Sequence, residues 1–180
     1  MTADEPRPEA IVPDDKDWTW VLSKRCPECG LDTAGLDLAA VPTMITDNAD
    51  GWVSVLEHDD VEVRPAPAVW SPLEYACHVR DVFDLYDYRL HLMLEEDDPL
   101  FPNWDQDETA VAEQYHRQDP AVVSSELTIA AQQLADSFAA VDGEQWRRTG
   151  RRSDGAVFTI ETFARYMIHD PIHHLSDVGG

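Results

Sequence analysis

The chain has 180 residues, enough for one domain with a full hydrophobic core that needs no covalent staples. Its 36 acidic and 13 basic residues give a formal net charge of −23, which repels the phosphate backbone and anionic membrane surfaces. Nucleic acid and membranes are therefore excluded as expected partners. The 3 cysteines are too few for a disulfide framework, which fits a reducing compartment.

The amino-terminal stretch, residues 1–17, is rich in proline and acidic side chains and has little to bury. We predict a disordered arm there. The stretch lacks the basic and apolar character of a signal peptide, and no apolar run in the chain approaches the length of a membrane span. We therefore expect a cytoplasmic protein.

The next motif is Cys26-Pro-Glu-Cys29-Gly30, which corresponds to half of a zinc ribbon or knuckle. A structural zinc ion needs four ligands, and the only other cysteine, Cys77, stands beside His78 far along the chain. A zinc ion shared across a dimer interface would supply the missing half. Two alternatives stay open: a redox dithiol, and a Pro-Gly turn with two reduced thiols. Cys26 and Cys29 are thus candidates for a second metal site or a redox site.

Two amphipathic helices follow. Apolar residues from Leu38 to Leu56 repeat with the three-four spacing of a helix. The second helix has a clear start, with Ser71 as N-cap, proline at the first helical position and Glu74 closing a capping box. His78 lies two turns into it, at the border of the apolar stripe, where a ligand would project from the wall of a bundle. Asp81, one turn later, is either an orienting partner for a ligand ring or simply a solvated acid.

The remaining helices carry the same kind of start signal. Asp105 and Glu108 predict a short helix that could cover the mouth of a bundle. Asp119, followed by proline, begins a third long helix, and Gly143 is expected just after its end. Thr159 caps the fourth. The basic segment 146–155 before it either receives an anionic group or neutralises nearby carboxylates, and we favour the second interpretation.

His169 and His173 stand four residues apart in the last helix, so their rings lie on one face and can bind one ion together. The best third ligand is His78. In the competing interpretation, His169 is a hydrogen-bonded core residue, while His173 and His174 form a solvated helix end. Pro171 lies between the two ligands and should either bend the helix or end it, and an end there would separate the two rings.

Four apolar stripes without strand-like alternation indicate an all-α bundle. The run Trp-Ser-Pro-x-Glu-x-x-x-His-x-x-Asp at residues 70–81 and the run His-Asp-x-x-His-His-Leu at residues 169–175 resemble the DinB-like superfamily. That superfamily includes metal-binding thiol transferases and mycothiol-dependent maleylpyruvate isomerases. The resemblance implies a DinB-like four-helix bundle over residues 36–180, with a short extra helix, preceded by a largely irregular arm over residues 1–35.

The resemblance also implies a site. His78, His169 and His173 match the three histidines of the family's metal site, and His174 is left as a neighbour. Asp81, Asp170 and Asp177 are candidate partners of the ligand rings. The implied cofactor is a divalent metal, Zn²⁺ before Ni²⁺ or Fe²⁺.

Three ligands leave a coordination position open for a reacting group. The expected function is transfer or isomerisation through a low-molecular-weight thiol resembling mycothiol, with a small-molecule electrophile as the second substrate and a homodimer as the assembly. The alternatives are a hydrolase that uses a metal-bound water, and a metal-binding bundle without catalysis.

Overall fold

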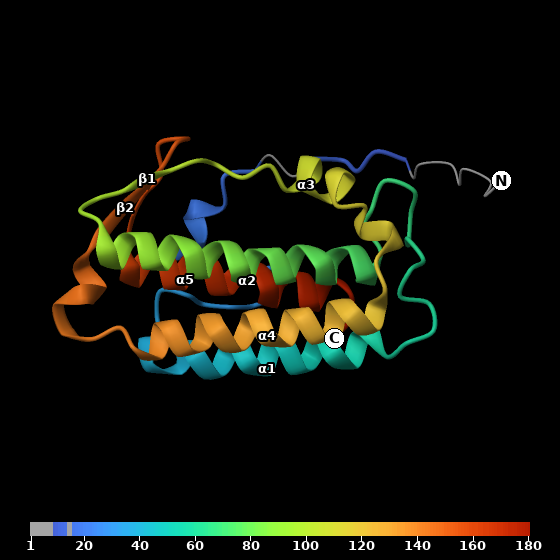
Figure 1. Cartoon of the computed structure of the whole chain (residues 1–180), viewed down its shortest axis with the longest axis horizontal. Helices are drawn as coiled ribbons and strands as arrows, with labels where there is room; N and C mark the ends of the chain where they lie inside the picture. The colour runs from blue at the N-terminus through green and yellow to red at the C-terminus, as the bar shows by residue number, and fades with distance from the viewer. Residues whose placement is uncertain (1–8, 14–15) are drawn as a thin grey trace.

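The computed structural model describes residues 9–13 and 16–180. Four long helices run side by side along the long axis of the molecule: α1 (Val41–Leu56), α2 (Pro72–Glu95), α4 (Pro120–Ala139) and α5 (Ile160–Asp177) (Figure 1). The short helix α3 (Gln106–Ala112) lies alongside α2, outside this bundle. The predicted four-helix bundle with one short extra helix is confirmed.

The order of the helices around the bundle determines which residues can meet. Helix α4 packs against α1 and α2, and α5 also packs against α1 and α2. The cyclic order is therefore α1, α4, α2, α5, with the consecutive helices α1 and α2 on a diagonal. This order makes α2 and α5 neighbours, although about ninety residues separate their histidine motifs in the sequence. The largest fully buried side chains belong to one hydrophobic core cluster: Trp52, Tyr115, Phe83, Phe101, Phe138, Phe163, Ile45, Leu73, Leu90, Met93, Leu127 and Leu134.

The predicted helix starts are formed by side chains that satisfy free backbone groups. The Ser71 hydroxyl accepts from the backbone N–H of Glu74 at 3.2 Å, and the Glu74 carboxylate accepts from the backbone N–H of Ser71 at 2.9 Å. Thr159 and Thr162 form the same reciprocal cap at the start of α5. At the start of α4, the Asp119 side chain accepts from the backbone N–H groups of Ala121 and Val122. The predicted stop at Gly143 was wrong, because α4 ends at Ala139 and Gly143 begins a separate 3-10 helix.

A small sheet is present that the sequence pattern did not predict. It consists of β1 (Leu100–Phe101), β2 (Thr149–Arg152) and β3 (Val157–Thr159), with β1 parallel and β3 antiparallel to β2. Strand β2 lies within the basic segment 146–155. A Cβ atom at Gly150 would lie 2.7 Å from Cγ of Met93, so only glycine allows β2 to approach the core this closely.

Helix α5 continues through Pro171 to Asp177, so the alternative of an early helix end is wrong. Proline cannot donate to the carbonyl of Met167. The carbonyl of Pro171 itself accepts a hydrogen bond from the Asn48 side chain of α1 at 2.9 Å, which ties this part of α5 to the bundle. His169 and His173 therefore stay on one helical face.

The segment from η1 (Trp18–Leu22) to η2 (Leu38–Ala40) lies against α5. The Arg165 guanidinium donates to the carbonyls of Thr33 at 2.5 Å and Leu36 at 2.8 Å and so fixes the segment to this helix. Part of the predicted disordered arm, residues 1–8 and 14–15, lies outside the described residues. The division into residues 1–35 and 36–180 stays a prediction. None of the helices in the described part of the chain has the length and apolar character needed to span a bilayer.

Candidate metal centre

Two groups of side chains that could hold a metal ion include residues of α5. The first, here called the His78 group, consists of His78, Asp170 and His174. The second, here called the cysteine–histidine group, consists of Cys26, Cys29, His169 and His173. Within each group, one potential ligand atom of every residue lies within 4.8 Å of those of all the others.

The structure does not bring the three predicted ligands together. His169 and His173 join the two cysteines, whereas His78 faces Asp170 and His174. The physical reason is that successive residues of a helix point about 100° apart. Positions 169 and 173 therefore face the amino-terminal segment, and positions 170 and 174 face α2. Whether either group binds a metal ion stays a prediction.

Pairs of histidines at four-residue spacing do not single out His174, because its partner at that spacing is Asp170. Asp170 and His174 have the same four-residue spacing as His169 and His173, and a carboxylate is as acceptable to zinc as an imidazole. Asp170, a predicted partner of a ligand ring, lies in one group with His78 and His174. The sequence thus contains a second pair of possible ligands with this spacing, one residue after the first.

The His78 group converges on the Asp170 carboxylate. Nε2 of His78 lies 3.2 Å from one oxygen, and Nε2 of His174 lies 3.6 Å from the other. The His78 ring is 1 % exposed and is stacked on Trp104, with 5.3 Å between ring centroids. Trp70 contacts the same ring at 5.3 Å. Two aromatic side chains thus fix the orientation of the imidazole.

The charges in this group are strongly coupled. Burial would raise the pKa of Asp170, but His78 and His174 outweigh it, so the pKa lies well below its ordinary value. Burial lowers the pKa of His174, but Asp170 and Asp177 raise it more, to about 9. The metal-free pair is accordingly an ion pair at neutral pH. His174 has to lose a proton before it can bind a metal.

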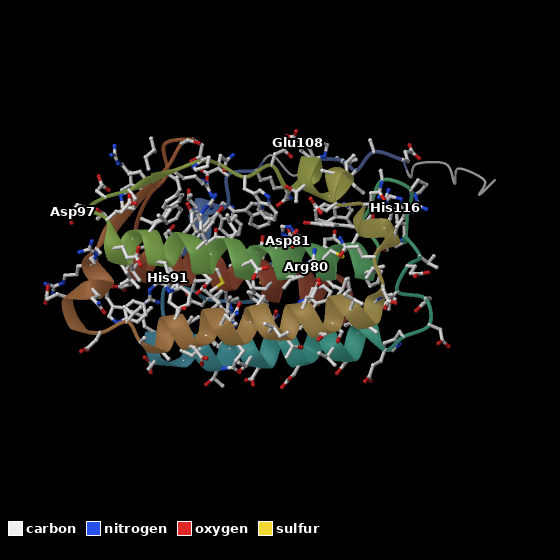
Figure 2. The ribbon with its side chains drawn as sticks, viewed as in Figure 1. Arg80, Asp81, His91, Asp97, Glu108 and His116 are labelled. Carbon is white, nitrogen blue, oxygen red and sulfur yellow. The ribbon has the colours of Figure 1, made fainter. Side chains whose placement is uncertain are left out.

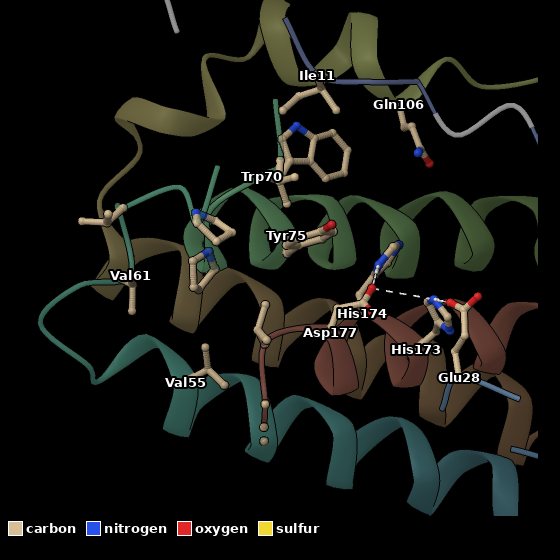
Figure 3. A pocket seen from close by; sticks show the side chains of 18 of the residues that line it. Ile11, Glu28, Val55, Val61, Trp70, Tyr75, Gln106, His173, His174 and Asp177 are labelled. Carbon is tan, nitrogen blue, oxygen red and sulfur yellow. Dashed lines mark hydrogen bonds and ion pairs between the residues drawn. The ribbon is translucent and has the colours of Figure 1, made fainter. Parts of the chain in front are cut away.

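Asp177, a predicted partner of a ligand ring, does contact one. Its Oδ2 lies 3.2 Å from Nδ1 of His174 and 3.7 Å from Nε2 of His173 (Figure 3). Asp81, predicted for the same role, binds Arg80 and Tyr115 instead. Its two oxygens accept from Arg80, at 2.8 Å, and from the Tyr115 hydroxyl; Figure 2 labels it on α2 beside Arg80.

In the cysteine–histidine group, Sγ of Cys26 lies 3.7 Å from Nδ1 of His173. Burial, followed by His173, lowers the pKa of His169 to about 4, so this ring is neutral at physiological pH. Burial raises the pKa of the Cys29 thiol. A hydrogen bond with the Leu31 backbone lowers this pKa by less, and Cys26 raises it further. The Cys29 thiol therefore keeps its proton at neutral pH in the metal-free protein.

Two cavities adjoin these groups. One, of about 850 Å³, is lined by all three residues of the His78 group and by Arg152 and Tyr166. The other, of about 1120 Å³, is lined by His173, His174 and Asp177 (Figure 3).

Arginines of the basic segment pair with neighbouring acids. Arg151 binds Asp98 at 2.9 Å, and Arg152 binds Asp154 at 2.8 Å. These contacts support the interpretation of this segment as neutralising carboxylates.

Comparison with known proteins agrees with the fold. The structure is similar to that of YfiT from Bacillus subtilis, a protein described as a probable metal-dependent hydrolase with an unusual four-helix bundle topology. The TM-score is 0.65 at 15 % sequence identity, covering 94 % of this chain and 92 % of that chain. No curated protein sequence matches the chain. A family model described as the DinB superfamily matches residues 44–178. This match spans most of the chain, which therefore belongs to the DinB superfamily.

Proposed function

We propose that the protein is a metal-dependent enzyme whose catalytic ion is held by His78, Asp170 and His174. The observation that carries the proposal is that the three ligand atoms converge within 4.8 Å on the wall of the 850 Å³ cavity. Two imidazoles and one carboxylate form a ligand set typical of catalytic zinc. Ni²⁺ and Fe²⁺ accept the same donors.

The surroundings of the group also fit an ion. Metal-binding histidines usually donate their second ring nitrogen to a carboxylate, and Nδ1 of His174 has such a partner in Asp177 at 3.2 Å. Nδ1 of His78 is buried and has no hydrogen-bond partner among the described residues. The ring is instead held by Trp70 and Trp104. Both ligand rings are thus oriented before an ion arrives.

Three protein ligands make an open site, in contrast to the four of a closed structural site. A divalent ion bound there would lower the pKa of a thiol or water in the cavity and so supply a nucleophile at neutral pH. Asp170 is exposed enough for this position to face the cavity, with 35 % of its side chain accessible. Arg152 and Tyr166 line the same cavity and would contact the substrate.

We propose a low-molecular-weight thiol as the nucleophile and a small electrophile as its partner, as the family resemblance implies. The transfer or isomerisation of a mycothiol-like adduct is the corresponding reaction. Hydrolysis is the second candidate, because YfiT, which has the same fold, is described as a probable metal-dependent hydrolase.

The test compares the zinc-loaded wild type with Asp170→Asn and His174→Ala. Each protein is given a panel of electrophiles with cysteine-derived thiols, and a panel of activated esters without thiol. We expect thiol-dependent turnover in the wild type and a loss of at least about 100-fold in both variants, because an ion-activated nucleophile depends on every ligand. His91→Ala, at an exposed histidine of α2, is the matched control and should retain full activity.

The two reactions give separate outcomes. Turnover of esters in the absence of thiol would assign hydrolysis to the protein in place of the thiol-dependent reaction. A protein that binds zinc through these residues and consumes no substrate of either panel would be a non-catalytic bundle, contrary to the proposal. Full activity in Asp170→Asn would contradict the assignment of the site.

A further inference from the structure

We propose that the cysteine–histidine group is a second metal site, a closed structural zinc centre that fixes the amino-terminal segment to α5. Its ligands are Cys26 and Cys29 from the segment and His169 and His173 from the helix. The second half that the Cys-x-x-Cys motif lacks in the sequence is thus supplied by α5 of the same chain. This inference does not rest on the proposed function.

The distances suit tetrahedral zinc. With typical Zn–S and Zn–N bonds, a thiolate sulfur and an imidazole nitrogen on one ion lie about 3.6 Å apart. Sγ of Cys26 and Nδ1 of His173 are 3.7 Å apart. All four ligand atoms lie within 4.8 Å of one another, so one ion can contact all of them after small side-chain movements.

Backbone hydrogen bonds stabilise the turn that carries Cys26 and Cys29. The N–H of Cys26 donates to the carbonyl of Leu31 at 2.9 Å, and the N–H of Gly30 donates to the carbonyl of Cys26 at 3.0 Å. Gly30 has a φ of 75°, a conformation that glycine adopts without strain. This turn holds both sulfurs on the side that faces α5.

The two histidines also have the surroundings of ligands. Nε2 of His173 lies 3.3 Å from a Glu28 carboxylate oxygen, which leaves Nδ1 to face the cysteines. Nε2 of His169 is buried and has no hydrogen-bond partner within the described residues. A buried nitrogen without a partner is costly, and a metal ion would satisfy it.

Charge and coordination number distinguish this group from the His78 group. Two thiolates and two neutral imidazoles balance the charge of Zn²⁺ and fill its four positions, as in structural sites. Cys26 is 0 % exposed, whereas a redox dithiol needs an accessible thiolate. The arrangement therefore favours a structural ion over redox exchange.

The expected effect of such an ion is to hold one wall of the 850 Å³ cavity. Trp18 lies over the rings of His169 and His173, with centroid distances of 5.4 and 5.1 Å, and it also lines the 850 Å³ cavity. Lys24 and Arg25 lie directly before Cys26, at the surface. Loss of the ion should release this segment from α5 and expose it.

The test uses cobalt as a spectroscopic probe on the full-length, reduced protein. Cobalt bound by thiolates gives a sulfur-to-metal charge-transfer band in the near ultraviolet, which oxygen and nitrogen ligands do not give. We expect this band in the wild type and in Asp170→Asn. The double variant Cys26→Ser/Cys29→Ser, which removes both sulfurs of the group, should lose the band together with one metal equivalent per chain. Cys77→Ser removes a buried cysteine outside both groups and should keep the band.

Trypsin provides a second readout that does not depend on activity. Zinc-loaded wild type should resist cleavage after Lys24 and Arg25, and cleavage there should become at least about tenfold faster in Cys29→Ser. A wild type that takes up cobalt without the band would overturn the proposal. A band that persists in Cys26→Ser/Cys29→Ser, or cleavage that zinc does not slow, would also overturn it.

Discussion

His173 and His174 are consecutive in α5, yet their rings meet almost at right angles, at 75° with 5.8 Å between centroids, and belong to different ligand groups. His173 faces Cys26, and His174 faces Asp170. One helix can therefore carry ligands for two ions on adjacent faces. Asp177 contacts both rings from the next turn and links the two groups.

This link leads to a prediction for Asp177→Asn. The carboxylate orients His174 through Nδ1, and removing such a partner typically lowers metal affinity about 10- to 100-fold. We expect this loss for zinc at the His78 group, measured by competition with a chromogenic chelator. The Cys29→Ser background isolates that group, because Asp177 also lies near His173. Asp136→Asn, at a surface carboxylate of α4, is the control, and equal affinities in the two variants would contradict this role.

A second prediction concerns the ion pair that holds the start of α2. The Glu74 side chain is 3 % exposed and accepts from Nε of Arg64 at 2.8 Å while closing the capping box. Arg64→Ala would leave this carboxylate buried and unpaired, so we expect a loss of about 3 kcal/mol in the free energy of unfolding in urea.

The matched control is Arg147→Ala. Arg147 and its partner Glu144 are 80 % and 85 % exposed, so this variant should change the unfolding free energy by less than about 1 kcal/mol. Equal losses in the two arginine variants would show that burial of Glu74 has no special cost.

The acidic face of α2 gives a prediction about pH. Burial raises the pKa of Asp84, and the charges of Asp81 and Asp87 add to the rise more than Arg80 offsets it. Since the pKa is higher in the folded than in the unfolded chain, folding favours the protonated form, and this contribution is lost as pH rises through the folded value. Asp84→Asn should therefore raise the melting temperature at pH 7. The gain should shrink as pH falls toward about 4, the usual pKa of aspartate. A gain that is constant over this range would contradict the explanation.

The fold was largely predictable from the sequence because its signals are local. Ser71 and Thr159 cap their helices through residues three positions away, and apolar spacing within each helix is enough to indicate a bundle. The sheet was not predictable, because β1 and β2 pair over about fifty residues and contain only two and four residues. Such short strands give no alternation to recognise.

The composition of the site was only partly predictable. The sequence identifies His78 and the motif 169–175, but not the rotation of α5, which decides whether positions 169 and 173 or positions 170 and 174 face α2. Contacts between residues far apart in the sequence hold α5 in place, among them the hydrogen bonds from Arg165 to the carbonyls of Thr33 and Leu36. Cys26 and His173 are separated by 147 residues, so no local pattern joins them.

The most direct test of the account is the number of metal ions per chain, measured by mass spectrometry of the zinc-loaded protein. The account predicts two ions in the wild type, one in Cys29→Ser and one in Asp170→Asn, with none in the double variant. A single ion that is lost on substitution of either His78 or His169 but retained in Cys29→Ser would contradict it, because one shared site would then replace the two groups.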